Sequence, residues 1–254
     1  MSAQAQPMIA TGGRRLVDHL DTAYAAEYLD RRTPSPRPTA APAARAAGHG
    51  FAFTAAAAGH GFAFTAAAAK YLAGAMAYDD LTRAADLKLR TARLARSRPK
   101  VDADDGALVT TTEYFHPRVA ELRKVVDRGR RTSPNIISGH LMLALVTGRG
   151  PKRRASLRHG REVAHIDAWE PTARAALGSR YELGVAVLGA RGLVKGYSET
   201  HAHGLLKFDR LLCAAPALMG RDDGAVSLDR LTRAAPADEK GGALDGVLLT
   251  VASR

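Results

Sequence analysis

The most regular hydrophobic pattern in the chain covers residues 71–98, YLAGAMAYDDLTRAADLKLRTARLARSR. Apolar residues fall there into two adjacent rows at helical spacing. One row holds Leu72, Met76, Ala84, Leu87 and Leu94, and the other holds Tyr71, Tyr78, Leu81, Ala85 and Leu89. The segment contains no proline and a single glycine. The pattern therefore predicts one long helix that is buried along two rows.

A row of charged side chains follows the same predicted helix. Its members are Asp79, Arg83, Asp86, Arg90 and Arg93, at steps of four, three, four and three residues. In each four-residue pair the acid precedes the base, which is the more stabilising order on a helix. Two interpretations are open: a solvated face, in which each pair contributes about 0.3–0.5 kcal/mol, or a charge ladder that meets another element.

The N-terminal pattern predicts a separate first helix within residues 1–32. Leu16, Leu20, Tyr24 and Tyr28 recur there every four residues. Prolines at positions 34, 36, 38 and 42 then end the helix and predict an extended linker over residues 33–47. The eleven residues GHGFAFTAAAA next occur twice in succession, at 48–58 and 59–69. Eleven residues make about three helical turns, so the second copy is expected to extend a helix on nearly the same face.

Shorter apolar segments follow the predicted long helix. They cover residues 136–146, 162–176, 181–193, 205–215, 227–234 and 238–251. Only TTTEYF, at 110–115, has the composition of a strand. We therefore predict a mainly α fold, an irregular multi-helix domain over residues 48–254 built around the long helix near 70–98.

Composition and charge add two points. Alanine supplies much of the 46% apolar content and aromatic residues only 6%, so the core is expected to bury little area per residue. The formal net charge of +12 would attract nucleic acid or an acidic partner. However, 8 of the 37 basic residues are lysine, and an Arg- and Ala-rich composition is also typical of GC-rich coding. With no apolar run near the ~20 residues of a membrane span and no signal-peptide pattern, we expect a cytoplasmic protein without membrane contact.

Residues 149–161, RGPKRRASLRHGR, form the most basic window of the chain. Such a window is able to bind phosphate groups. It has no interleaved aromatic residues for base stacking and no recognisable nucleic-acid-binding signature. Nucleic-acid binding is therefore disfavoured.

Residues 195–204, KGYSETHAHG, interrupt the helical periodicity between two apolar segments. Loops of this kind often carry function. His201 and His203, together with Glu199, would make a partial metal site, or His201 would transfer protons. The favoured interpretation is a turn in which Gly196 and Gly204 supply unusual backbone angles.

No catalytic motif is complete in this sequence. The glycine-rich dinucleotide and phosphate loops, the nucleophile elbow and paired CxxC cysteines are all missing. The single cysteine, Cys213, excludes an internal disulfide and an iron–sulfur cluster held by this chain alone. We assign no catalytic residue, no metal ligand and no cofactor to the chain itself.

Four segments stand in the same order as in one known family. They are RRLVDHLDTAYAAEYLDR (14–31), AYDDLTRAADLKLRTARLARSR (77–98), LVKGYSETHAHGLLKFDRLL (193–212) and ADEKGGALDGVL (237–248). Together they resemble the C-terminal helical extension of the indolepyruvate:ferredoxin oxidoreductase beta subunit, in the 2-oxoacid:acceptor oxidoreductase family. The chain departs from that pattern in the duplication at 48–69 and in a shorter stretch at 126–135.

The resemblance implies a partner system. Enzymes of that family decarboxylate aryl 2-oxoacids oxidatively, pass electrons to ferredoxin and form a coenzyme A thioester. Their alpha subunit carries thiamine diphosphate and iron–sulfur clusters, and their beta subunit begins with a Rossmann-like catalytic domain. The present sequence corresponds to the region appended to that domain, so no catalytic role is carried over to any of its residues.

Two hypotheses follow. In the first, the chain is an accessory or split helical domain that packs on the catalytic beta domain and the alpha subunit. The charge ladder and the 195–204 loop would then be structural or interface sites, with the ladder meeting a partner element. In the second, it is a stand-alone basic module that binds nucleic acid or an acidic protein. The candidate residues are Asp79, Asp80, Arg83, Asp86, Lys88, Arg90, Lys195, Tyr197 and His201.

Overall fold

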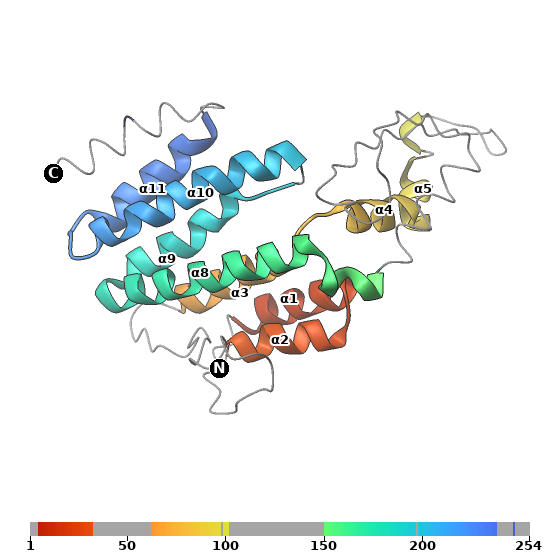
Figure 1. Ribbon diagram of the computed structural model, residues 1–254, viewed down its shortest axis with the longest axis horizontal. Helices are drawn as coiled ribbons and strands as arrows, with labels where there is room; N and C mark the ends of the chain where they lie inside the picture. The colour runs from red at the N-terminus through yellow and green to blue at the C-terminus, as the bar shows by residue number, and fades with distance from the viewer. Residues whose placement is uncertain are drawn as a thin grey trace. The chain divides into compact units, whose positions relative to one another are not determined.

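The computed structural model describes residues 5–32, 62–97, 99–101, 150–196, 198–237 and 246, and none of these lies in a strand. The α-helices are α1 (Gln6–His19), α2 (Thr22–Arg32), α3 (Ala63–Met76), α4 (Leu81–Leu89), α5 (Thr91–Ser97), α8 (Leu157–Ser179), α9 (Tyr181–Ala190), α10 (Ser198–Leu218) and α11 (Gly224–Ala234) (Figure 1). Short 3-10 helices cover Pro99–Val101, Gly150–Ala155, Arg191–Leu193 and Ala235–Ala237. The mainly α prediction is confirmed. The linker at 33–47, the first copy of the repeat and the segments at 110–115 and 136–146 lie outside the described residues.

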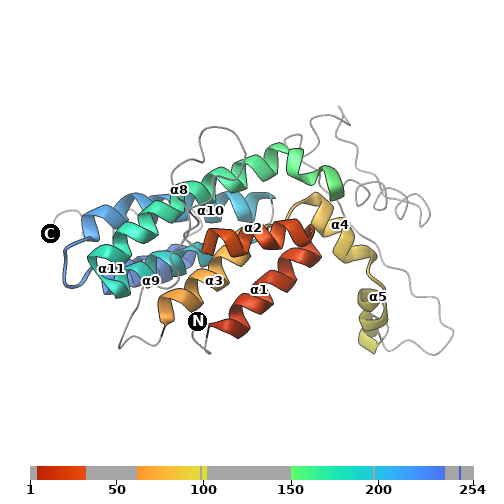
Figure 2. The ribbon, with the colours of Figure 1, turned by 90° about the horizontal axis from the view of Figure 1, so that it is seen from below.

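The chain forms two compact units. The main unit comprises residues 1–78 and 162–254, and the inserted unit comprises residues 79–161. In the main unit, α1 packs against α2 and α3, and α3 also packs against α9. Helix α9 in turn packs against α10 and α11. Figure 2 shows α1, α2 and α3 side by side at one end of this arrangement.

Aromatic side chains hold the core of the main unit together. Trp169 of α8 is fully buried, donates a hydrogen bond from Nε1 to the Val187 carbonyl of α9 (3.3 Å) and meets the Phe208 ring of α10 edge-on. On the other side, Tyr24 Oη donates to the Met76 carbonyl (3.1 Å) and Tyr28 Oη to the Ala69 carbonyl (3.0 Å). Both bonds satisfy a buried phenol, and the first also satisfies a carbonyl at the end of α3 that has no partner within the helix.

Two predicted helices are broken in the structure by aspartate caps. The predicted N-terminal helix is divided into α1 and α2, because the Asp21 carboxylate accepts a hydrogen bond from the Tyr24 amide (2.7 Å). The prediction of a single helix over residues 71–98 is wrong, because the structure divides this segment among α3, α4 and α5. Asp80, in extended backbone, caps α4 by accepting from the Arg83 amide (2.7 Å), and Arg90 is again extended and ends α4. Aspartate caps a helix better than it continues one, so the local cap outweighed the periodicity.

Among the described helices, none is long and apolar enough to cross a lipid bilayer.

Two adjacent glycines in α1 provide a test of this packing. A Cβ at Gly12 would lie 2.8 Å from Tyr28 Oη and 2.9 Å from Ala73 Cβ, whereas a Cβ at Gly13 would meet nothing within 4 Å. We predict that Gly12→Ala lowers the free energy of unfolding by about 1–3 kcal/mol through overpacking. Gly13→Ala should raise it by about 0.5–1 kcal/mol, because alanine favours the helix. Urea unfolding of both variants measures the difference, and effects of equal sign would contradict the close contact of α1 with α2 and α3.

Candidate functional site

The most tightly bonded candidate residue is Asp80, in the inserted unit. Its carboxylate accepts two hydrogen bonds from Arg153, from Nε (2.7 Å) and from Nη2 (2.6 Å), in addition to the Arg83 amide. Asp80 and Arg153 are only 6% and 5% exposed. This two-point geometry is the strongest form of carboxylate–guanidinium contact. It fixes the start of α4 to the 3-10 helix Gly150–Ala155. Asp80 and Arg153 are 73 residues apart in the sequence.

The rest of the predicted charge ladder does not lie on one helix. Asp79 precedes α4 and Arg93 belongs to α5, so the five charges share no continuous face. Asp86 accepts from Arg83 (2.9 Å) and from Arg90 (2.7 Å), but the Asp86 and Arg90 side chains remain 32% and 37% exposed. Partly exposed pairs of this kind contribute at most about 1 kcal/mol. Asp80, which is not part of the predicted ladder, is the residue that contacts another element, while Asp86 of the ladder pairs within its own segment.

Lys88 lies half-buried in the last turn of α4. A cation at this position interacts favourably with the negative end of the helix dipole. Lys88 is thus placed where a cation stabilises its own helix.

The segment at 195–204 is a short turn followed by the first turns of α10. Gly196 adopts a positive φ of 68°, and Lys195 beside it is exposed. Tyr197 lies outside the described residues. Because α10 begins at Ser198, residues 201 and 203 are about 200° apart around the helix axis. Helix α10 therefore does not bring all three residues together: His201 lies on a different face from Glu199 and His203, which are four residues apart.

His201 instead faces the interior of the main unit. Its Nε2 lies 3.0 Å from Glu162 Oε1, and Arg191 Nη2 donates to Glu162 Oε2 (3.4 Å). All three residues are at most 5% exposed, and the Arg191 guanidinium lies 5.3 Å from the centre of the Phe208 ring. The Glu162 carboxylate thus joins α8 to the residues that precede and follow the 195–196 turn. No cluster of three or more potential metal ligands exists in the part of the chain that the structure describes.

A third charged cluster joins α2 to α8 and was missed by the sequence reasoning. Arg31 donates to Asp167 (2.8 Å) and to Glu170 Oε1 (3.2 Å), and its Nε is 3.6 Å from Glu27. The Glu170 side chain is completely buried, and its Oε2 has no hydrogen-bond partner among the described residues. Burial raises the pKa of Glu170 to about 7, although the nearby Arg31 acts in the opposite direction. The cluster therefore contains a buried carboxyl group that ionises near neutral pH.

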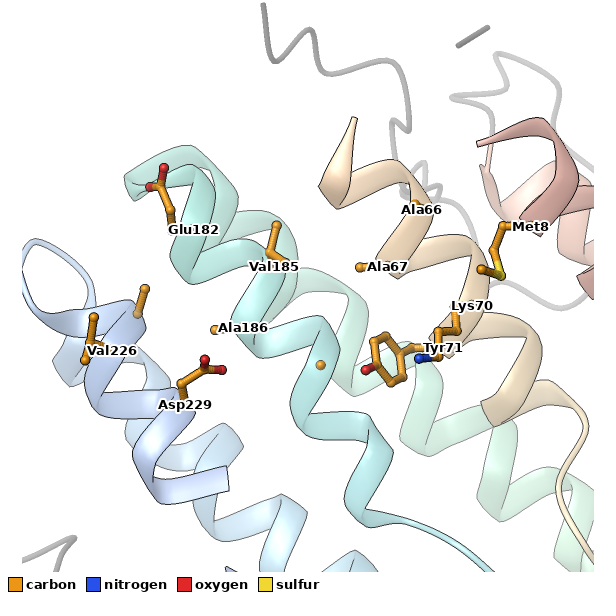
Figure 3. Close-up of a pocket in the computed structure, with 12 residues that line it drawn as sticks. Met8, Ala66, Ala67, Lys70, Tyr71, Glu182, Val185, Ala186, Val226 and Asp229 are labelled. Atoms are coloured by element: carbon orange, nitrogen blue, oxygen red, sulfur yellow. The ribbon is translucent and has the colours of Figure 1, made fainter. Parts of the chain in front are cut away.

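The main unit also has an open groove of about 580 Å³ between helices α1, α3, α9 and α11 (Figure 3). We call it the α3–α9–α11 groove. Its charged edge residues are Lys70, Glu182 and Asp229. Its apolar lining includes Ala66, Ala67, Val185, Ala186, Gly189 and Ala225. No residue of the groove was among the predicted candidates.

Residues 5–213 match the model of DUF6537, a family of unknown function. The chain belongs to this family. No curated protein and no solved structure matches the chain. The DUF6537 region contains all three charged clusters and most of the groove, while α11 lies beyond the matched residues.

Asp80 and Asp86 form a matched pair for testing which carboxylate holds the inserted unit together. Asp80→Asn should lower stability by about 3–5 kcal/mol, because it removes the carboxylate charge that the buried Arg153 guanidinium contacts at two points. Asp86→Asn should cost about 1 kcal/mol or less, because the Asp86 side chain is 32% exposed and that of Arg90 is 37% exposed. Chemical denaturation followed by circular dichroism measures both. Equal losses would place the two carboxylates in equivalent environments, contrary to the structure.

Glu170→Gln should change stability in a pH-dependent manner. The folded-state pKa of about 7 lies above the ordinary value of 4.5, so protonation favours the folded state. The stability that the protonated Glu170 contributes to the folded state is fully present below pH 4.5. It is lost as the pH rises through 7. Glutamine cannot ionise, so the variant should exceed the wild type by about 2–3 kcal/mol at pH 8 and show little gain at pH 5.

Denaturant unfolding at pH 5 and pH 8 provides the measurement. Asp167→Asn is the control, because Asp167 contacts the same Arg31 but its side chain is 39% exposed. A gain for Glu170→Gln of the same size at both pH values would rule out the buried, ionising carboxyl.

Proposed function

We propose that the chain is a helical accessory domain of a 2-oxoacid:ferredoxin oxidoreductase, of the kind that extends the indolepyruvate:ferredoxin oxidoreductase beta subunit. In this proposal it docks on the catalytic beta domain and the alpha subunit in the cytoplasm. Oxidative decarboxylation of aryl 2-oxoacids takes place on those partners, which hold thiamine diphosphate, iron–sulfur clusters and coenzyme A. The chain contributes assembly and carries out no separate reaction.

The observation that carries the proposal is that charged candidate residues form buried ion pairs within the chain. Asp80 pairs with Arg153, and His201 and Glu162 form a buried cluster with Arg191. These side chains connect elements distant in sequence and are buried against neighbouring helices. Such an arrangement positions helices relative to one another, as expected of a scaffold. The four collinear segments that resemble the beta-subunit extension supply the identity of the partners.

Reconstitution tests this function directly. The chain, the catalytic beta domain and the alpha subunit are co-expressed, and the complex is isolated through a tag on the alpha subunit. We expect the chain to co-purify in a fixed ratio and to increase aryl 2-oxoacid-dependent ferredoxin reduction. Failure to co-purify, combined with the same activity when the chain is left out, would overturn the proposal.

A second candidate function rests on the charge of the inserted unit. Residues 79–161 contain 19 basic and 9 acidic residues, so they carry ten of the twelve net positive charges of the chain. Arg96, Lys100, Arg154 and Arg161 are exposed. In this alternative the inserted unit binds nucleic acid or an acidic protein by itself.

The salt dependence of binding to duplex DNA and to poly-glutamate separates the two candidates. A basic binding module should bind one of these polymers with an affinity that falls steeply between 50 and 200 mM salt, since phosphate contacts release counterions. Binding that is absent at low salt, or independent of salt, would exclude the alternative. Co-purification with the catalytic beta domain and the alpha subunit would then decide on the accessory function.

A further inference from the structure

We propose that the α3–α9–α11 groove binds an amphipathic helix of the catalytic subunits, a proposal that rests on the accessory function above. The helix would present large apolar side chains to the groove. One of its edges would be basic, toward α9 and α11, and the other acidic, toward α3. The occupant is thus defined by shape, hydrophobicity and charge.

The first argument comes from α9. Its sequence, YELGVAVLGA, is apolar on almost every side. Leu183, Val187 and Leu188 are fully buried in the core, whereas Val185 and Gly189 face the groove and are only half-buried. A helix that is apolar all round is normally covered all round. In the described part of the main unit, this face of α9 is left open to the groove.

The second argument is the shape of the groove lining. Small side chains from three helices form part of it, and larger ones stand beside them. The small ones include Ala66 and Ala67 of α3, Ala186 of α9 and Ala225 of α11, and the larger apolar ones are Met8, Tyr71, Val185 and Val226. Small residues let an incoming helix approach closely. On α9 the lining positions are 182, 185, 186 and 189, the three- and four-residue spacing at which one helix packs against another.

The third argument is the distribution of charge at the edges. Lys70 lies on the α3 side, and Glu182 and Asp229 lie on the opposite side (Figure 3). All three residues are exposed. Asp229 also pairs with Arg233 at 3.2 Å, but both side chains are more than half exposed, so this pair is weak and can exchange for a partner's cation. Opposite charges on the two edges favour one orientation of the bound helix.

Site-specific photo-crosslinking tests where the partner lies. A benzophenone amino acid replaces Val226, which lines the groove and is 54% exposed, or Leu206, which is 61% exposed and lies outside the groove. Both variants are irradiated in complex with the catalytic beta domain and the alpha subunit. Position 226 should form cross-links to a single helical segment of a catalytic subunit, and position 206 should not.

A charge reversal tests the edge. Asp229→Lys should weaken association with the catalytic subunits at least tenfold. Asp222→Lys makes the same charge change at a side chain that is 95% exposed and lies outside the groove, so association should be nearly unchanged. Circular dichroism confirms that both variants fold.

The outcomes separate the two proposals. If the wild-type chain does not associate with the catalytic subunits, both the accessory function and this inference fail. If it associates but position 226 gives no cross-link, or Asp229→Lys behaves like Asp222→Lys, the accessory function stands and the groove is not the docking site. A cross-link from position 226 to a second copy of the chain would likewise overturn the inference, in favour of self-association.

Discussion

Three buried arginines determine which helices of this chain meet. Arg153 joins its 3-10 helix to the start of α4, Arg31 joins α2 to α8, and Arg191 joins α8 to the turn before α10. Each meets a carboxylate that is itself at most 9% exposed. Desolvation offsets much of the attraction in such pairs. Loss of Asp80 removes a two-point contact from a buried guanidinium and is costly, whereas Arg31 keeps Asp167 and Glu27 when Glu170 is neutralised. Each pair therefore links elements that are far apart in the sequence and adds little net stability.

The composition explains why this chain needs such contacts. Many of its buried positions are alanine, which fills little space and gives helix surfaces shallow ridges. Helices with shallow ridges slide over one another at small cost. Hydrogen bonds from side chains to backbone carbonyls oppose this sliding. The Tyr24 and Tyr28 hydroxyls of α2 and the Trp169 indole of α8 fix how their helices are aligned with the neighbouring ones.

The sequence allowed the helical class and much of the core to be predicted, because both depend on local periodicity. Leu72 and Met76 are buried as predicted, whereas Leu87, in the same predicted row, is 40% exposed. The break at Asp80 was missed because two consecutive aspartates also fit a charged helical row, and only the extended backbone at Asp80 distinguishes a cap from a ladder. Partners as far apart as Arg31 and Glu170, at 139 residues, leave no local signal. The candidate groove was missed for the same reason, since its lining comes from four helices that are far apart in the sequence.

The α3–α9–α11 groove differs from the internal contacts in where its charges lie. Inside the units, Arg153, Arg31 and Arg191 are buried and make directional bonds to buried carboxylates. At the groove the lining is apolar, and the charges stand at its exposed edges. An apolar lining supplies affinity, while exposed edge charges mainly set orientation and the rate of association. Contacts of this type form and dissociate without unfolding either partner. The structure thus combines an interior held by buried ion pairs with an exposed apolar groove, which is the surface that we propose for docking.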